Sequence, residues 1–86
     1  MFYVYVLQSL KSKHWHTGYT HDLRKRFSQH NANEFGWTKN HGPFRMIYYG
    51  ACLHEEDAKD REVYLKTGMG ERYLKNRLKR FLSLTG

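Results

Sequence analysis

Two pairs of side chains in this sequence have types and spacings suited to binding an anion and moving a proton. Arg26 and His30 are four residues apart, which places them on one face if this segment is helical. A guanidinium binds phosphate oxygens through paired hydrogen bonds, and an imidazole one turn away can donate, accept or shuttle a proton near neutral pH. Tyr3 and Tyr5 alternate with valine and so share one face of a strand, where they are either packing residues or titratable phenols.

Two further features could belong to the same site. His16 opens a short segment with Gly18, a residue that permits either a close approach of phosphate or backbone, or a β-bulge. Glu62 falls on or beside the inward side of an expected helix, where a carboxylate needs a partner. That partner is either a hard divalent cation, which one or two carboxylates can bind, or a neighbouring arginine or lysine. A phenol or imidazole, an arginine and a carboxylate are together the parts needed for metal-assisted phosphodiester hydrolysis.

Strands are expected where aromatic and β-branched residues cluster without proline. Residues 2–7, 15–19 and 44–52 have this character and predict three strands. The polar stretch at 8–14 indicates a hairpin loop between the first two. Residues 32–43 contain two Gly, two Asn and the only Pro, and therefore predict an exposed loop before the third strand.

Helices are expected where apolar residues recur three or four apart. The first follows an N-cap at Thr20 and ends near residue 31, and the second runs from the acidic residues at 55–57 to about residue 66. A break at 67–70 separates it from a last helix that begins near Glu71. The order is β-β-α-β-α-α, and the fold class is α/β (α+β): a small three-stranded, mainly antiparallel sheet flanked by helices, as one domain over residues 1–86.

Composition narrows the class of protein. Lys and Arg number 15 against 8 Asp and Glu, and the net charge of +7 favours an anionic partner, with nucleic acid as the first expectation. The single cysteine, Cys52, excludes an internal disulfide and argues against a zinc site. No apolar run reaches the ~20 residues that cross a bilayer, and no basic leader stands at the N-terminus. We therefore expect a cytoplasmic protein without a membrane partner.

The order and spacing of these residues resemble the GIY-YIG endonuclease superfamily, most closely its small single-domain bacterial members, which are similar to the nuclease module of excinuclease. Tyr3-Val4-Tyr5 resembles the first half-motif, and His16-Thr17-Gly18, which begins eleven residues after Tyr5, resembles the second. Arg26 falls ten residues after His16, where the family has its arginine. His30 matches a common histidine and Glu62 matches the glutamate that binds the metal. The likeness covers nearly the whole chain.

This resemblance implies a metal-dependent endonuclease that hydrolyses phosphodiester bonds in nucleic acid, with DNA as the expected substrate and Mg²⁺ or Mn²⁺ as the cofactor. No obligate protein partner is expected. Arg26 would clamp the phosphate and Glu62 would bind the metal. The catalytic residues that it implies are Tyr5, His16, Arg26, His30 and Glu62. The residues expected to contact nucleic acid are Tyr3, Gly18, Arg24, Lys25 and Lys39.

His16 departs from the family pattern, in which the second half-motif begins with tyrosine. An imidazole that titrates near pH 6.5 is a competent general base in its place. The alternative function is a catalytically impaired nucleic-acid-binding module on the same fold, which binds without cleaving. A third interpretation is a small basic protein that docks a partner on its last helix, which leaves the spacing of Tyr5, Arg26 and Glu62 as coincidence.

Overall fold

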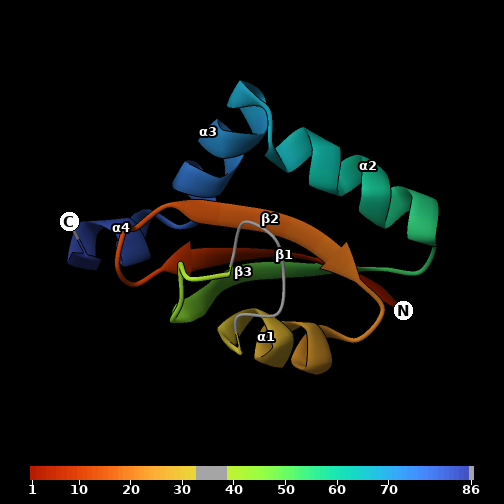
Figure 1. Cartoon of the computed structure of the whole chain (residues 1–86). Coiled ribbons are helices and arrows are strands. Elements are labelled where there is room, and N and C mark those ends of the chain that lie inside the picture. The colour runs from red at the N-terminus through yellow and green to blue at the C-terminus, as the bar shows by residue number, and fades with distance from the viewer. Residues whose placement is uncertain (33–38, 86) are drawn as a thin grey trace.

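The computed structural model describes residues 1–32 and 39–85 and contains one antiparallel sheet with the strand order β2-β1-β3. β1 (Phe2–Ser9) lies in the centre, between β2 (Trp15–Thr20) and β3 (Phe44–Cys52) (Figure 1). All three strands are rich in aromatic and β-branched residues, which suit a pleated, half-buried surface. Because β1 pairs on both sides, β2 is left as an edge of the sheet.

The two faces of β1 pack into different clusters, because successive side chains point to opposite sides of a sheet. Val4 and Val6 are buried on one face, against Leu65 and Leu74. Tyr5 and Leu7 are buried on the other face with Phe44, and Leu23 and Phe27 pack against them. A tyrosine therefore stands in the core of the second face.

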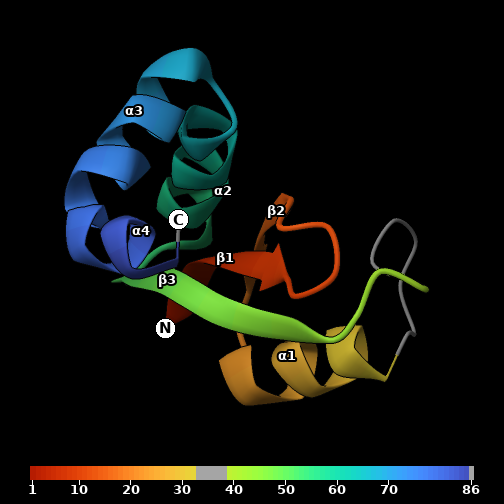
Figure 2. The ribbon, with the colours of Figure 1, turned by 90° about the vertical axis from the view of Figure 1, so that its left-hand side faces the viewer.

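In the described part of the chain, four helices cover the sheet. α1 (Leu23–Asn31) lies on the Tyr5 face, and α2 (Glu55–Leu65) and α3 (Gly68–Arg77) lie on the other face (Figures 1 and 2). The short α4 (Lys79–Thr85) follows α3. A Cβ at Gly70 would overlap the backbone of Tyr64 and Leu65, so this glycine permits the close approach of α3 to the end of α2.

The predicted fold class and three-stranded antiparallel sheet are confirmed. The N-cap predicted at Thr20 is wrong by two residues. Asp22 caps α1, because its Oδ1 accepts a hydrogen bond from the Lys25 backbone N–H at 3.1 Å. The Thr20 hydroxyl instead accepts from the Asp22 N–H at 3.1 Å, which fixes the turn between β2 and α1.

The end of the chain also differs from the prediction. The expected break at 67–70 is a single residue: Thr67 caps α3 through its hydroxyl, which accepts from the Gly70 N–H at 3.1 Å. α3 therefore begins at Gly68, and Leu78 separates it from α4, so the one predicted last helix is two. Residues 33–38 of the expected loop lie outside the described residues. Within the described ranges, no helix is long and apolar enough to cross a membrane.

Candidate active site

Three aromatic side chains from three elements meet on the α1 face of the sheet. Tyr5 lies on β1, His16 on β2 and His30 on α1. The Tyr5 hydroxyl is 2.8 Å from Nε2 of His30, and the ring centroids of His16 and His30 are 5.0 Å apart. The register pairs Tyr5 with Gly18, two residues from His16, so the two side chains share this face. The structure thus brings together three of the residues that the sequence singled out.

Gly18 makes room for the Tyr5 ring. It is buried directly across the strand pair from Tyr5, and a Cβ here would lie 2.5 Å from the Tyr5 hydroxyl oxygen. The close approach predicted at Gly18 is therefore filled by a phenol. The β-bulge alternative does not apply, because the register shift lies between β1 and β3 at Val6 and Leu7. Contact of Gly18 with nucleic acid stays a prediction.

Burial sets the protonation of the Tyr5–His30 pair. Burial raises the pKa of Tyr5 to about 12, although the charge of Arg26 acts to lower it. Burial lowers the pKa of His30 to about 4, and His16 and Arg26 add to the effect. At neutral pH the phenol keeps its proton and donates a hydrogen bond to unprotonated Nε2. His30 therefore orients the Tyr5 hydroxyl and does not take its proton in the resting protein.

His16 is the member of this cluster that reaches an open surface. It is half-buried and lines a depression of about 380 Å³. Burial, and after it the charge of Lys66, lower the pKa of His16, whereas Glu62 acts to raise it. A neutral imidazole at an open depression can accept a proton from a water molecule or a ligand. The other lining residues are Trp15, Thr17, Leu65, Lys66 and Glu71.

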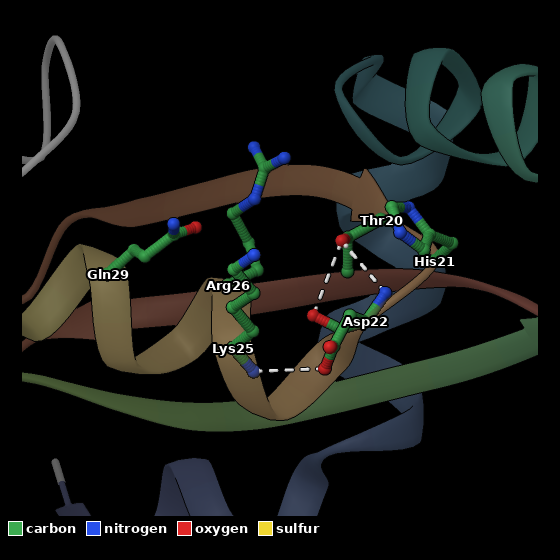
Figure 3. A pocket seen from close by; sticks show the side chains of 6 residues that line it. All are labelled: Thr20, His21, Asp22, Lys25, Arg26 and Gln29. Carbon is green, nitrogen blue, oxygen red and sulfur yellow. Dashed lines mark hydrogen bonds between the residues drawn. The ribbon is translucent and has the colours of Figure 1, made fainter.

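Arg26 and Glu62 act on this cluster from helices on the two faces of the sheet. Arg26 on α1 lowers the pKa of Tyr5 through its charge and a hydrogen bond, and Glu62 on α2 raises it. Figure 3 shows the Arg26 side chain extending from α1 toward β2. The Glu62 side chain is 20% exposed, and its Oε2 accepts from Lys66 Nζ at 3.2 Å. The salt-bridge alternative for Glu62 is thus present, with Lys66 as the partner.

The residues expected to contact nucleic acid lie in several places. Tyr3 and Arg24 line one depression together with Tyr49, whose ring packs edge-on to Tyr3 at 6.3 Å between centroids. Lys25 lines another depression beside Arg26, and Lys39 is exposed. Apart from the buried Gly18, these residues are accessible to a ligand, but only Lys25 adjoins a residue of the catalytic set.

Two polar residues beside Arg26 were missed by the sequence reasoning. His21 and Gln29 line depressions that Arg26 also lines. Gln29 follows Arg26 by three residues on one helix, so helical spacing alone could have identified it. His21 lies in the turn before α1, where no periodicity indicates which way a side chain points.

Proteins with similar sequences and structures are known. Residues 1–82 match the model of the GIY-YIG catalytic domain. UPF0213 protein CPE1444 of Clostridium perfringens is 37% identical over 68 residues, which cover 77% of this chain and 71% of that protein. UPF0213 protein BH0048 of Halalkalibacterium halodurans is 35% identical over 65 residues, with coverages of 74% and 68%. The solution NMR structure of the UPF0213 protein BH0048 from Bacillus halodurans superposes with a TM-score of 0.54 at 30% identity, over 88% of this chain and 84% of that one.

Proposed function

Since this chain belongs to the GIY-YIG catalytic domain family, a family of nucleases, we propose that it is a metal-dependent endonuclease that hydrolyses phosphodiester bonds in DNA. The observation that carries the proposal is the meeting of Tyr5, His16 and His30 on one face of the sheet. Arg26 and Glu62, which come from different helices, both act electrostatically on that meeting point. A structural role alone does not require such a combination of residues.

His16 is the general base in this proposal. Its lowered pKa keeps the imidazole neutral at pH 7, and the depression that it lines admits water. The oxygen of the attacking water forms a bond to phosphorus, and its proton goes to His16. The bond from phosphorus to the 3′ oxygen breaks, and the departing oxygen is protonated by solvent. Tyr5, with a pKa of about 12, keeps its proton and is a hydrogen-bond donor at the site.

Arg26 binds the phosphate and neutralises the charge that builds up on its oxygens. A guanidinium is always charged and presents a fixed fork of donors that matches two phosphate oxygens. Arg26 is half-buried in the first turns of α1, so its position is set before the substrate binds. Donors that are fixed in this way stabilise the transition state at no further cost in reorganisation.

Glu62 is the residue that would hold a divalent metal. Among the described residues, no group of three or more His, Cys, Asp or Glu side chains could hold a metal ion. A partly buried carboxylate beside the cluster does fit Mg²⁺ or Mn²⁺, since such ions often use one or two carboxylates and take their other ligands from water and substrate phosphate. When bound, the metal supplies Lewis-acid polarisation of the phosphate and stabilisation of the leaving oxygen. Lys66 then has to give up its contact with Glu62.

The test is incubation of the purified protein with labelled single-stranded, double-stranded and branched DNA, and with matching RNA, in Mg²⁺, Mn²⁺ or EDTA. We expect cleavage of DNA with the metals and none with EDTA. Tight binding without cleavage in every metal would instead support the second candidate, a catalytically impaired binding module. The observation that favours this candidate is His16, which stands where the family has tyrosine.

A further inference from the structure

A second depression adjoins Arg26. It has a volume of about 200 Å³ and lies where β2 turns into α1 (Figure 3). The lining residues are Thr20, His21, Asp22, Lys25, Arg26 and Gln29. Arg26 is the one member of the catalytic set among them. This arginine therefore connects the depression to the reaction site.

The lining is polar and offers mainly hydrogen-bond donors. Lys25 and Arg26 bring positive charge, Gln29 an amide and His21 an exposed imidazole. The single acid, Asp22, is already engaged, because its Oδ1 caps α1 through the Lys25 N–H at 3.1 Å. A phosphate group, which accepts several hydrogen bonds and carries negative charge, has the chemistry that matches this lining.

We propose that this depression binds the phosphate next to the scissile phosphate on the cleaved strand. The proposal rests on the nuclease function proposed above and assigns to it a second phosphate subsite. The scissile phosphate has to lie near Tyr5, His16 and Glu62, none of which lines the depression, so the occupant is a neighbouring phosphate. Lys25 and Gln29 are then positioning residues, which hold the strand so that Arg26 meets the phosphate to be cut.

Oligonucleotides in which one neutral methylphosphonate replaces each phosphate in turn test the subsite. In the wild-type protein, a neutral linkage next to the cleaved bond should lower kcat/KM about tenfold or more, because charge-assisted hydrogen bonds are lost. In the double variant Lys25→Ala, Gln29→Ala, that penalty should largely disappear, because the contacts are already absent. An equal penalty in wild type and variant would overturn the proposal.

Arg24→Ala is the matched control. Arg24 neighbours Lys25 on α1 and carries the same charge, but it lines the depression beside Tyr3 and Tyr49. This variant should weaken binding to all oligonucleotides about equally and retain the methylphosphonate penalty. If Arg24→Ala removes the penalty as completely as the double variant does, the effect is one of overall charge, and the subsite is wrong.

Binding of thymidine 3′,5′-bisphosphate without metal, followed by ¹H–¹⁵N NMR, separates the subsite from the nuclease function. Amide shifts in residues 20–29 that the double variant loses support the subsite, whether or not the protein cleaves DNA. Cleavage of DNA without a methylphosphonate penalty, together with no shifts in residues 20–29, would overturn the subsite and leave the nuclease function intact.

Discussion

The Tyr5 hydroxyl donates a hydrogen bond of 2.8 Å to Nε2 of His30, and each residue is 2% exposed. This contact joins the central strand to α1 inside a cluster that is otherwise apolar, with Leu7 and Phe44 as neighbours. The imidazole can accept this hydrogen bond only while Nε2 is unprotonated. The stability of the fold and the protonation of His30 are therefore linked.

Stability should fall as the pH is lowered through the range in which His30 gains a proton. The pKa of His30 is about 4 in the folded chain and 6.5 in an unfolded one. Because the unfolded chain binds the proton more readily, the stabilisation is complete above pH 6.5 and is lost as pH falls toward 4. We expect a loss on the order of 2 kcal/mol, measured by urea unfolding at a series of pH values.

His30→Gln is the control for this linkage. The variant has no imidazole to titrate at this position, so its stability should depend less steeply on pH between 4 and 6.5 than that of the wild type. His16 contributes in the same direction, because its pKa is also lowered, and some slope will remain. A variant with the full wild-type slope would assign the pH dependence to groups other than His30.

The sheet could be predicted because its strands carry an unambiguous pattern. Tyr3-Val4-Tyr5 and the run at 46–49 are apolar, aromatic and β-branched, and no competing helical period exists there. The division of the last helix was not predictable, because the apolar residues Leu74, Leu78 and Leu82 continue the helical spacing across the break. Local capping by Thr67 also overrode the usual interpretation of glycine as a helix breaker.

The members of the site were predictable, but their protonation was not. Spacing alone placed Tyr5, Arg26, His30 and Glu62 on defined faces. The pKa shifts depend on how completely α1 covers Tyr5 and His30, and a residue pattern contains no measure of that burial. The ion pair with Lys66 could be named only as one of several possible partners for Glu62, since helical spacing does not decide which neighbour a carboxylate contacts.

Gly18→Ala should displace the Tyr5 ring. The new Cβ would lie 2.5 Å from the phenol oxygen, so the strand pair or the ring has to move and the hydrogen bond to His30 is disturbed. We expect a destabilisation of roughly 1–3 kcal/mol and a loss of cleavage. Gly50→Ala on β3 is the control, because the nearest atoms there are 3.6 Å away. Equal stability of the two variants would show that Gly18 is not required for the position of Tyr5.

Arg26→Ala should abolish most cleavage and leave the fold intact. Arg26 is half-buried at the surface of α1, and the apolar cluster beneath that helix does not include it. Loss of a preorganised donor to the transition state typically lowers the rate by on the order of 10²–10³. Single-turnover cleavage, with circular dichroism as the check on folding, measures this effect. Turnover near the wild-type rate by the folded variant would remove Arg26 from the mechanism.

Glu62→Gln should lose metal-dependent cleavage and keep, or improve, binding to DNA, because a negative charge near the phosphates is removed. Stability should change by less than about 1 kcal/mol, since the pair with Lys66 is partly exposed. Glu56→Gln is the matched control on the same helix, because Glu56 has its own exposed pair with Lys59 at 3.4 Å. The control should cleave normally. Undiminished Mg²⁺-dependent cleavage by Glu62→Gln would contradict its assignment as the metal ligand.

His16 should control how cleavage depends on pH. The imidazole is the active form of a general base, and burial together with Lys66 lowers its pKa below 6.5. Activity should therefore rise with pH and reach its plateau below the range of 6 to 7 that a free histidine would give. Glu62 acts to raise the same pKa, so Glu62→Gln should lower the inflection further in any residual activity.

Substitution at His16 distinguishes the two candidate functions. His16→Ala should lose on the order of 10²–10⁴ in rate, since general base catalysis contributes that much. His16→Tyr restores the residue type of the family pattern, and its activity should rise only at higher pH, because a phenol gives up its proton near 10. If the wild type is inert in every metal and His16→Tyr cleaves, the chain is the impaired binding module. If His16→Ala cleaves as fast as the wild type from pH 5 to 8, the imidazole is not the base, and the proton must leave by another group.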